Sequence, residues 1–243
     1  MADTGTGNSR RAFEGQGTPD EMFAVQEAYK AIRTNIILSV IKDGCKRLVV
    51  TSPLAGEGKS TTAINVAISL AQAYNRVLIV DCDLRRPRVH KALGAAGNPG
   101  LTNVLSGMAA VRDAVQPTKF DNLCVMAAGL AAPNPAEMLA SPKMAALLDE
   151  LSASFDYILL DTPPINVVSD ALPIAKVSDG VVLIVRRKKS VHSEIQKALA
   201  ALEFIQAKVI GLVLNDAEDD SKKNARYRSR YRYGYGTPGA VKK

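Results

Sequence analysis

Six short apolar segments recur along the chain between residues 46 and 215, with helical patterns between them. They are Leu48–Thr51, Val77–Asp81, Leu123–Met126, Tyr157–Asp161, Val181–Val185 and Val209–Leu214. The segments are rich in β-branched residues and almost continuously apolar, which is typical of strands that are covered on both faces. Repeated strand–helix–strand units predict an α/β fold with a mostly parallel, doubly wound sheet and helices on both faces.

Three long helices have clear sequence signals. The first begins with Thr18 as N-cap and Pro19 at the first helical position, and Glu21 completes a capping box. Its apolar stripe, which predicts packing on the body, is Met22, Val25, Tyr29, Ile32 and Ile36. A second helix has Ser141 as N-cap, Pro142 at the first position, and the apolar face Met144, Leu147, Leu148 and Leu151. A third has the face Val191, Ile195, Leu199, Leu202 and Ile205.

The charge of the chain is concentrated at its C-terminus. The 243 residues carry a formal net charge of +7, and residues 221–243 contain eight of the 31 Lys and Arg but none of the 24 Asp and Glu. The rest of the chain is therefore nearly neutral, which excludes a generally basic nucleic-acid-binding body. We predict a disordered segment over 1–17, one domain over 18–215 and a flexible Tyr/Arg-rich tail over 216–243.

Several other classes of protein are excluded by composition. The sequence contains no window of about 18 apolar residues, so we expect no transmembrane helix. The polar N-terminus is not a secretory signal. Cys45, Cys82 and Cys124 lie far apart and form no CxxC pair, which argues against a disulfide framework, a zinc site or a cysteine-ligated cluster. These features predict a cytoplasmic chain.

A glycine-rich loop joins the first strand to a helix expected from Thr61. Its sequence is Ser52-Pro-Leu-Ala-Gly-Glu-Gly-Lys-Ser60, and such a turn presents backbone N–H groups to phosphate oxygens. Lys59 would reach the β- and γ-phosphates and the Ser60 hydroxyl would bind Mg²⁺, although Pro53 replaces the first glycine of the usual GxxxxGK[ST] pattern. The predicted nucleotide-binding residues are Ala55, Gly56, Glu57, Gly58, Lys59, Ser60 and Thr61. The alternative is a surface glycine turn with an incidental lysine.

Carboxylates follow two further strands. Asp81 and Asp83 lie two residues apart after the second strand, so they point the same way, and Asp161 ends another strand. Ligands of open α/β sheets bind at the carboxyl ends of strands. A single Asp there is as often a cap or turn former, but the three features together predict Mg-ATP binding. Lys59, Asp81, Asp83 and Asp161 are the predicted catalytic residues, and Ser60, Asp81 and Asp161 the predicted magnesium ligands.

The stretch Asp81-Cys-Asp-Leu-Arg-Arg-Pro87 resembles the second Walker-type motif of bacterial tyrosine kinases, which control the polymerisation and export of capsular and exopolysaccharides. Further resemblance lies in Gly100–Gly107, Pro133–Leu139, Asp161–Pro164 and Ser169–Ala171. The likeness covers about Val25 to Lys243 and implies a P-loop NTPase of the deviant-Walker, partitioning-ATPase-like superfamily. Septum-positioning and partitioning ATPases carry an extra loop lysine where this chain has Leu54, which argues against those branches of the superfamily. The iron–sulfur-carrier branch needs a CxxC motif, which this sequence lacks.

The tail contains four tyrosines among arginines and glycines: Tyr227, Tyr231, Tyr233 and Tyr235. From the residues alone, the tail could be an unstructured basic segment or a platform on which single-stranded nucleic acid stacks. The resemblance implies instead that these tyrosines are autophosphorylated in trans and that no nucleic acid is bound. It also makes Asp83 the candidate that accepts the phenolic proton.

The first helix carries Glu27, Lys30 and Arg33 on a second face, similar to the ExxRxxR oligomerisation motif of the same kinases. A solvated charged face is the alternative. Lys30 replaces the usual Arg, and a lysine ammonium group cannot make the paired hydrogen bonds of a guanidinium group. The resemblance implies a homo-oligomeric ring, such as an octamer, in which these residues dock into a neighbour's nucleotide site. Asn215, at the end of the last strand, is a candidate for adenine binding or a turn-forming residue.

The resemblance also implies partners and a location. These are a membrane polysaccharide co-polymerase that activates the kinase and a cognate tyrosine phosphatase. The chain would lie at the inner face of the plasma membrane, held there by its partner or by a fused transmembrane region. Two alternative functions stay open at this point: a partitioning- or localisation-type ATPase, and a nucleotide-gated scaffold without kinase activity.

Overall fold

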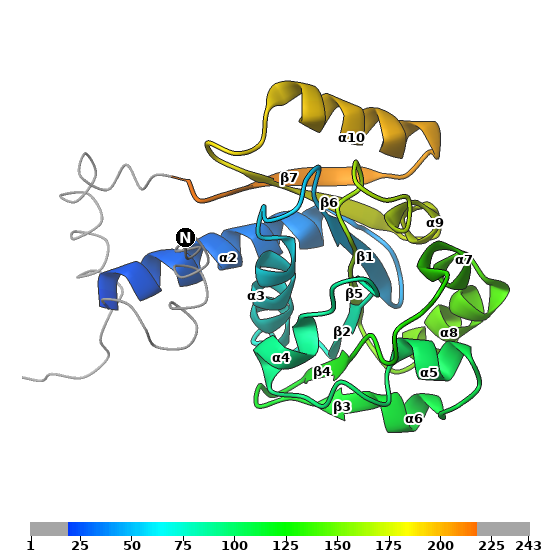
Figure 1. Ribbon diagram of the computed structural model, residues 1–243. Helices are drawn as coiled ribbons and strands as arrows, with labels where there is room; N and C mark the ends of the chain where they lie inside the picture. The colour runs from blue at the N-terminus through cyan, green and yellow to red at the C-terminus, as the bar shows by residue number, and fades with distance from the viewer. Residues whose placement is uncertain (1–18, 218–243) are drawn as a thin grey trace, which may run out of the picture.

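A computed structural model of the protein describes residues 19–217, and its chain path is shown in Figure 1. Seven strands form one sheet in the order β3-β4-β2-β5-β1-β6-β7. The strands are β1 (Lys46–Thr51), β2 (Val77–Asp81), β3 (Val115–Pro117), β4 (Leu123–Met126), β5 (Tyr157–Asp161), β6 (Gly180–Arg186) and β7 (Val209–Asn215). The predicted boundaries at residues 17 and 216 lie at the edges of the described residues and stay predictions.

The predicted mostly parallel sheet is confirmed, and all six expected strands are present. The expected strands pair in parallel, whereas β3 is antiparallel to β4 at the edge of the sheet. The sequence does not predict β3, because this strand has only three residues, ends in Pro117 and is partly exposed. Such a segment has neither the length nor the apolar run that predicts a buried strand.

Helices of two lengths connect the strands. The long ones are α2 (Pro19–Ser39), α3 (Lys59–Ala71), α8 (Pro142–Ser152) and α10 (His192–Phe204). The short ones, which the periodicity did not predict, are α4 (Val89–Leu93), α5 (Leu101–Leu105), α6 (Val111–Ala114), α7 (Pro135–Leu139) and α9 (Ala171–Lys176). No helix among residues 19–217 is long and apolar enough to cross a membrane.

The predicted helix starts are confirmed in part. The described part of α2 begins at Pro19, while its expected cap Thr18 lies outside the described residues. Ser141 caps α8 as predicted, since its hydroxyl accepts a hydrogen bond from the backbone N–H of Met144. The prediction that α3 begins at Thr61 is wrong. Gly58, in a left-handed conformation, is the N-cap and the helix begins at Lys59.

Two apolar cores lie on opposite faces of the sheet, as a doubly wound fold requires. Alternate residues of β5 point to different cores: Tyr157 and Leu159 face α2, α3 and α4, whereas Ile158 and Leu160 face the core packed by α8 and α10. In Figure 1 the blue and cyan helices α2 and α3 lie on one side of the sheet, and the green α8 lies on the other. Both faces of the central strands are therefore closed to water.

The apolar stripe of α2 packs on the body as predicted. Tyr29 and Ile36 are buried in the core beside α3. Arg33 adds a polar attachment, because its guanidinium donates to the carbonyl oxygen of Ser69 in α3 at 2.8 Å. This contact fixes α2 against the helix that follows the glycine-rich loop.

The strand order brings the predicted functional residues together. β5 lies between β1 and β2, and Asp81 and Asp161 are direct partners across the β2–β5 pair. Val50 of β1 is paired with Asp161 from the other side. The glycine-rich loop and both acidic strand ends therefore meet at one edge of the sheet.

Gly100, which precedes α5, packs so closely against the backbone after β4 that no side chain fits there. A Cβ atom at this position would lie 2.4 Å from the carbonyl oxygen of Ala127 and 2.5 Å from the backbone N of Gly129. The backbone N–H of Leu101 also donates to the Ala127 carbonyl oxygen at 2.8 Å. The start of α5 therefore lies directly on the backbone that follows β4.

We predict that Gly100→Ala lowers the free energy of unfolding by about 1–3 kcal/mol, because backbone atoms cannot move aside for the new methyl group. Denaturant unfolding of the full chain measures this effect. Gly211→Ala is the matched control, since a Cβ there meets no atom within 4 Å and should change stability by less than about 0.5 kcal/mol. Equal stability of the two variants would contradict this account of the packing.

Candidate functional site

The glycine-rich loop has the backbone form of a phosphate-binding loop. Gly56 and Gly58 both have positive φ angles, +77° and +93°, which other residues rarely adopt. A Cβ on Gly58 would lie 1.9 Å from the amide nitrogen of Asn215. Gly58 is thus required both by its conformation and by its neighbour, whereas Pro53, at the variant position of the motif, is buried.

The side chain of Glu57 points into the protein. It is fully buried, one carboxylate oxygen accepts the backbone N–H of Leu54 at 2.8 Å, and the other accepts the hydroxyl of Ser190. Buried carboxylates are stable only with such partners. Of the predicted nucleotide-binding residues, Glu57 therefore has only its backbone available to a nucleotide, and its side chain holds the loop in shape.

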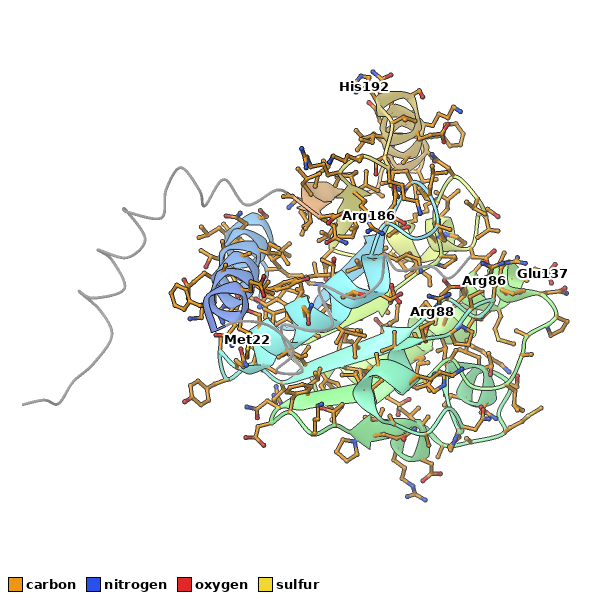
Figure 2. The ribbon with its side chains drawn as sticks, turned by 60° about the vertical axis from the view of Figure 1, so that its left-hand side comes forward. Met22, Arg86, Arg88, Glu137, Arg186 and His192 are labelled. Atoms are coloured by element: carbon orange, nitrogen blue, oxygen red, sulfur yellow. The ribbon has the colours of Figure 1, made fainter. Side chains whose placement is uncertain are left out.

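The ends of β6 and β7 also hold the phosphate loop. The Asn215 amide donates to the carbonyl oxygen of Glu57 at 3.0 Å, and its own oxygen accepts the backbone N–H of Asp216. Arg186, labelled in Figure 2, donates to the carbonyl oxygen of Gly56 at 3.2 Å. Asn215 thus supports the loop, and a contact with adenine stays a prediction.

Sequence reasoning missed Arg186 and Ser190. The signal was available, because Arg186 ends β6 and Ser190 follows four residues later, and the carboxyl ends of parallel strands gather ligand-binding residues. Arg186, Arg187, Lys188 and Lys189 form a basic run that has the composition of an ordinary exposed turn. The hydrogen bonds that show its role join residues about 130 positions apart in the chain.

Lys59 and Asp83 form an ion pair at the start of α3. Lys59 Nζ lies 2.9 Å from Asp83 Oδ2, and both side chains are largely buried. Burial lowers the pKa of Lys59, but the carboxylates of Asp161 and Asp83 outweigh this effect and raise it overall. Lys59 is therefore a fixed positive charge. The other oxygen of Asp83 accepts the backbone N–H of Arg86 at 3.0 Å.

Asp81 is surrounded by backbone donors. Its Oδ2 accepts the N–H groups of Arg88 and Val89 at 2.9 and 3.0 Å, and its Oδ1 accepts that of Asp83 at 3.2 Å. Burial, followed by the nearby charge of Asp161, raises the pKa of Asp81 despite these bonds. With both oxygens engaged, Asp81 suits a role through water better than direct metal ligation.

Asp161 is the member of the group with a free oxygen. Its Oδ1 is buried and has no hydrogen-bond partner among the described residues. Burial raises its pKa to about 6, although the charge of Lys59 and the hydroxyl of Ser60 act in the opposite direction. A buried carboxylate oxygen without a partner requires a cation or water.

The donor set beside Asp161 fits Mg²⁺. The Asp161 carboxylate contacts the Ser60 hydroxyl and keeps one oxygen without a partner, and oxygen donors of this kind are what Mg²⁺ prefers. Within residues 19–217, no three His, Cys, Asp or Glu side chains are arranged to hold a metal alone. Mg²⁺ in proteins usually has phosphate oxygens and waters among its ligands, so a small protein donor set is the expected one.

A second ion pair stands close to this group of carboxylates. Arg85, in the loop after β2, donates to both oxygens of the buried Asp170 at 2.7 and 3.1 Å. From the sequence alone, Arg85 and Arg86 could steady phosphates, bind a neighbouring chain or lie in a solvated loop. The structure assigns Arg85 to this ion pair, which ties the loop after β2 to the start of α9.

The predicted oligomerisation residues all lie on α2. On α2, Lys30 pairs with Glu27 at 2.7 Å on the exposed surface, whereas Arg33 is bound to Ser69 in its own chain. Only two of the three candidate oligomerisation side chains are therefore presented outward. The four candidate phosphorylation sites, Tyr227, Tyr231, Tyr233 and Tyr235, lie outside the described residues.

Comparison with known proteins agrees with this geometry. A ParA family model, described as an NUBPL iron-transfer P-loop NTPase, matches residues 45–236. The chain is 38% identical over 212 residues to the putative tyrosine-protein kinase CapB of Staphylococcus aureus, covering 87% of this chain and 90% of CapB. It is 40% identical over 211 residues to the tyrosine-protein kinase YwqD of Bacillus subtilis (strain 168), covering 87% of this chain and 86% of YwqD.

A solved structure has the same fold over nearly the same length. The chimerical protein CapA2B2 is similar to the chain with a TM-score of 0.79 and 33% identity, over 87% of this chain and 91% of that chain. The description of the family model mentions iron transfer, whereas the three cysteines of this chain lie far apart and form no CxxC pair. The chain therefore belongs to the ParA-type P-loop NTPase family and, within it, to the bacterial tyrosine-protein kinases.

Proposed function

We propose that this kinase transfers the γ-phosphoryl group of ATP to the tyrosines of its own C-terminal cluster, between neighbouring copies, with Mg²⁺ as cofactor. The observation that supports it most is the grouping of Lys59, Asp83 and Asp161 at the end of a phosphate-binding loop. The tyrosine cluster of the tail supplies a substrate in the same chain.

The transfer needs an acceptor for the phenolic proton. A phenol has a pKa near 10 and is protonated at neutral pH. As the tyrosine oxygen forms its bond to the γ-phosphorus, the bond from that phosphorus to the β–γ bridging oxygen breaks and ADP leaves. The phenolic proton passes to Asp83, the residue that the resemblance makes the base.

In this scheme Lys59 interacts with Asp83 and with the transferring phosphoryl group. Its ammonium group is positioned by Asp83 at 2.9 Å, and its charge stabilises the oxygens of the transferring group, which is the main source of catalysis in phosphoryl transfer. Bound Mg²⁺ would neutralise phosphate charge, held by Ser60 and Asp161. Asp81, whose oxygens accept three backbone N–H groups, fixes the loop that carries Asp83.

We also propose that the chain forms a homo-oligomeric ring through α2 and acts beside a membrane polysaccharide co-polymerase. Glu27 and Lys30 are exposed and available, while Arg33 would have to leave Ser69 to join a neighbour. The similarity to CapA2B2 and to CapB supports a role in capsule or exopolysaccharide export at the inner face of the plasma membrane. A tyrosine phosphatase would remove the phosphate groups from the tail.

The first prediction concerns Lys59. Incubation of the full chain with Mg-ATP, followed by mass mapping, should find phosphate on Tyr227, Tyr231, Tyr233 or Tyr235, and Lys59→Met should reduce it by at least about 100-fold because the phosphate-binding charge is lost. Lys176→Met, at the exposed end of α9, should leave it unchanged. ATP turnover stimulated by DNA or lipid without tail phosphate would favour a partitioning-type ATPase, and tight ATP binding with neither would favour a scaffold.

The second prediction concerns the support of the phosphate loop. Ser190→Ala leaves one oxygen of the buried Glu57 without its partner, so ATP binding should weaken by roughly tenfold. Titration with a fluorescent ATP analogue measures the dissociation constant. Ser193→Ala, in the first turn of α10 and exposed, is the matched control. Unchanged affinity in Ser190→Ala would show that the loop does not need the hydrogen bond between Ser190 and Glu57.

The third prediction concerns the pH dependence of stability. Because the folded-state pKa of Asp161 is raised to about 6, the folded chain binds this proton more tightly than the unfolded chain, and stability without nucleotide should fall as pH rises from about 4 to about 6. Asp161→Asn should therefore raise the melting temperature at pH 7.5 by about 2–6 °C, and by less at pH 4.5. It should abolish kinase activity at both.

Asp121→Asn is the control for this measurement, since Asp121 is exposed and should not change the melting temperature at either pH. A lower melting temperature of Asp161→Asn at pH 7.5 would mean that the carboxylate stabilises the fold, and would contradict the proposed cost of burying it.

A further inference from the structure

The loop that follows β2 forms a cavity beside the catalytic carboxylates. The cavity has a volume of about 310 Å³ and is lined by Arg86, Pro87, Arg88 and Lys91. We call it the basic cavity. Figure 2 shows Arg86 and Arg88, its two labelled arginines, close together on this loop. The basic cavity is separate from the phosphate loop and has no role in the transfer described above.

The cations of the basic cavity have no acidic partners among the described residues. Arg86, Arg88 and Lys91 are all exposed, and none of them forms an ion pair with a side chain of residues 19–217. Arg85, their neighbour, is different, because it is held by Asp170. Three uncompensated positive charges around one cavity favour an anionic ligand.

The basic cavity is held in a fixed position relative to the catalytic centre. The backbone N–H of Arg86 donates to Asp83 at 3.0 Å, and that of Arg88 donates to Asp81 at 2.9 Å. The residues that line the cavity are thus attached to the two carboxylates through their own backbone. A ligand in the cavity would therefore lie on the same loop as Asp83.

The residues that line the cavity suit an aromatic phosphate. Arginine presents parallel donors that match two oxygens of a phosphate, and lysine adds a point charge. The ring of Pro87 and the aliphatic stems of the arginines give an apolar wall against which an aromatic ring can pack. Inorganic phosphate would use the charges but not this wall.

We propose that the basic cavity binds a phosphotyrosine of a tail that has already been phosphorylated once. This proposal rests on the proposed function, which supplies such tails. The unmodified tail has eight Lys and Arg and no acidic residue over 221–243, so the cavity repels it. Each phosphate adds about −1.5 to −2 charges, which reverses the sign of the interaction at that residue.

The short spacing of the tail tyrosines means that binding of one phosphotyrosine in the basic cavity affects phosphorylation of the next. Tyr231, Tyr233 and Tyr235 are two residues apart, and two residues of extended chain span roughly 6.5–7 Å. One phosphotyrosine held in the basic cavity therefore keeps the next tyrosine near Asp83. The first phosphorylation of a tail should accelerate those that follow.

A binding experiment tests the proposal without any kinase turnover. The full chain is treated with a tyrosine phosphatase until its mass shows no phosphate, and is titrated against fluorescent peptides of residues 225–237, with and without phosphate on Tyr231. The phosphopeptide should bind at least about tenfold more tightly. The double variant Arg88→Gln, Lys91→Gln should lose this difference, and Arg88→Lys should lose only part of it.

Lys119→Gln is the matched control, because Lys119 is an exposed cation in the turn between β3 and β4, away from the cavity. It should bind the phosphopeptide as the unmodified chain does, and melting temperatures check that all variants are folded. Equal affinity for both peptides, or equal losses in the cavity and control variants, would overturn the proposal. Competition by inorganic phosphate at the same concentration as the phosphopeptide would also overturn it, by showing a simple phosphate site.

Failure of this test and failure of the proposed kinase function are distinguishable. The peptides are synthetic, so binding is measured whether or not the chain phosphorylates itself. Tail phosphorylation without phosphopeptide binding would support the kinase function and reject only the proposed role of the basic cavity.

Discussion

The alignment of β2 and β5 is the constraint on which the rest of the structure depends. Parallel pairing places Asp81 directly beside Asp161, and the two apolar cores exclude water from both faces of these strands. Two carboxylates in such a position repel each other and are costly to bury. The fold offsets this cost with the charge of Lys59 and with backbone N–H donors, and the remaining unpartnered oxygen of Asp161 is what makes the site suitable for a cation.

The phosphate loop depends on parts of the chain that are far away in sequence. Its shape is maintained by Ser190 after β6 and by Asn215 at the end of β7. Asp216, next to Asn215, pairs with Arg186, which also contacts the loop at Gly56. The end of β7 and the residue that follows it therefore lie against the phosphate loop.

Much of this fold could be predicted from the sequence, because both faces of the central sheet are buried and its strands are therefore continuous apolar runs. The carboxylates at strand ends were predicted for the same reason, since parallel strands bring their carboxyl ends together. The short strand β3 and the short helices have too few residues to show a period. The bond between Ser190 and Glu57 could not be predicted, because no local pattern indicates which hydroxyl meets a buried carboxylate 133 positions away.

The central claim, phosphoryl transfer between copies of this chain, is tested most directly by mixing two variants. One carries Lys59→Met and an intact tail, and the other has an intact site but phenylalanine at Tyr227, Tyr231, Tyr233 and Tyr235. Neither can label its own tail, so after addition of Mg-ATP the account predicts tail phosphate on the Lys59→Met chain only in the mixture. If the mixture shows no tail phosphate while the unmodified chain phosphorylates itself, transfer occurs within one chain and the account is contradicted.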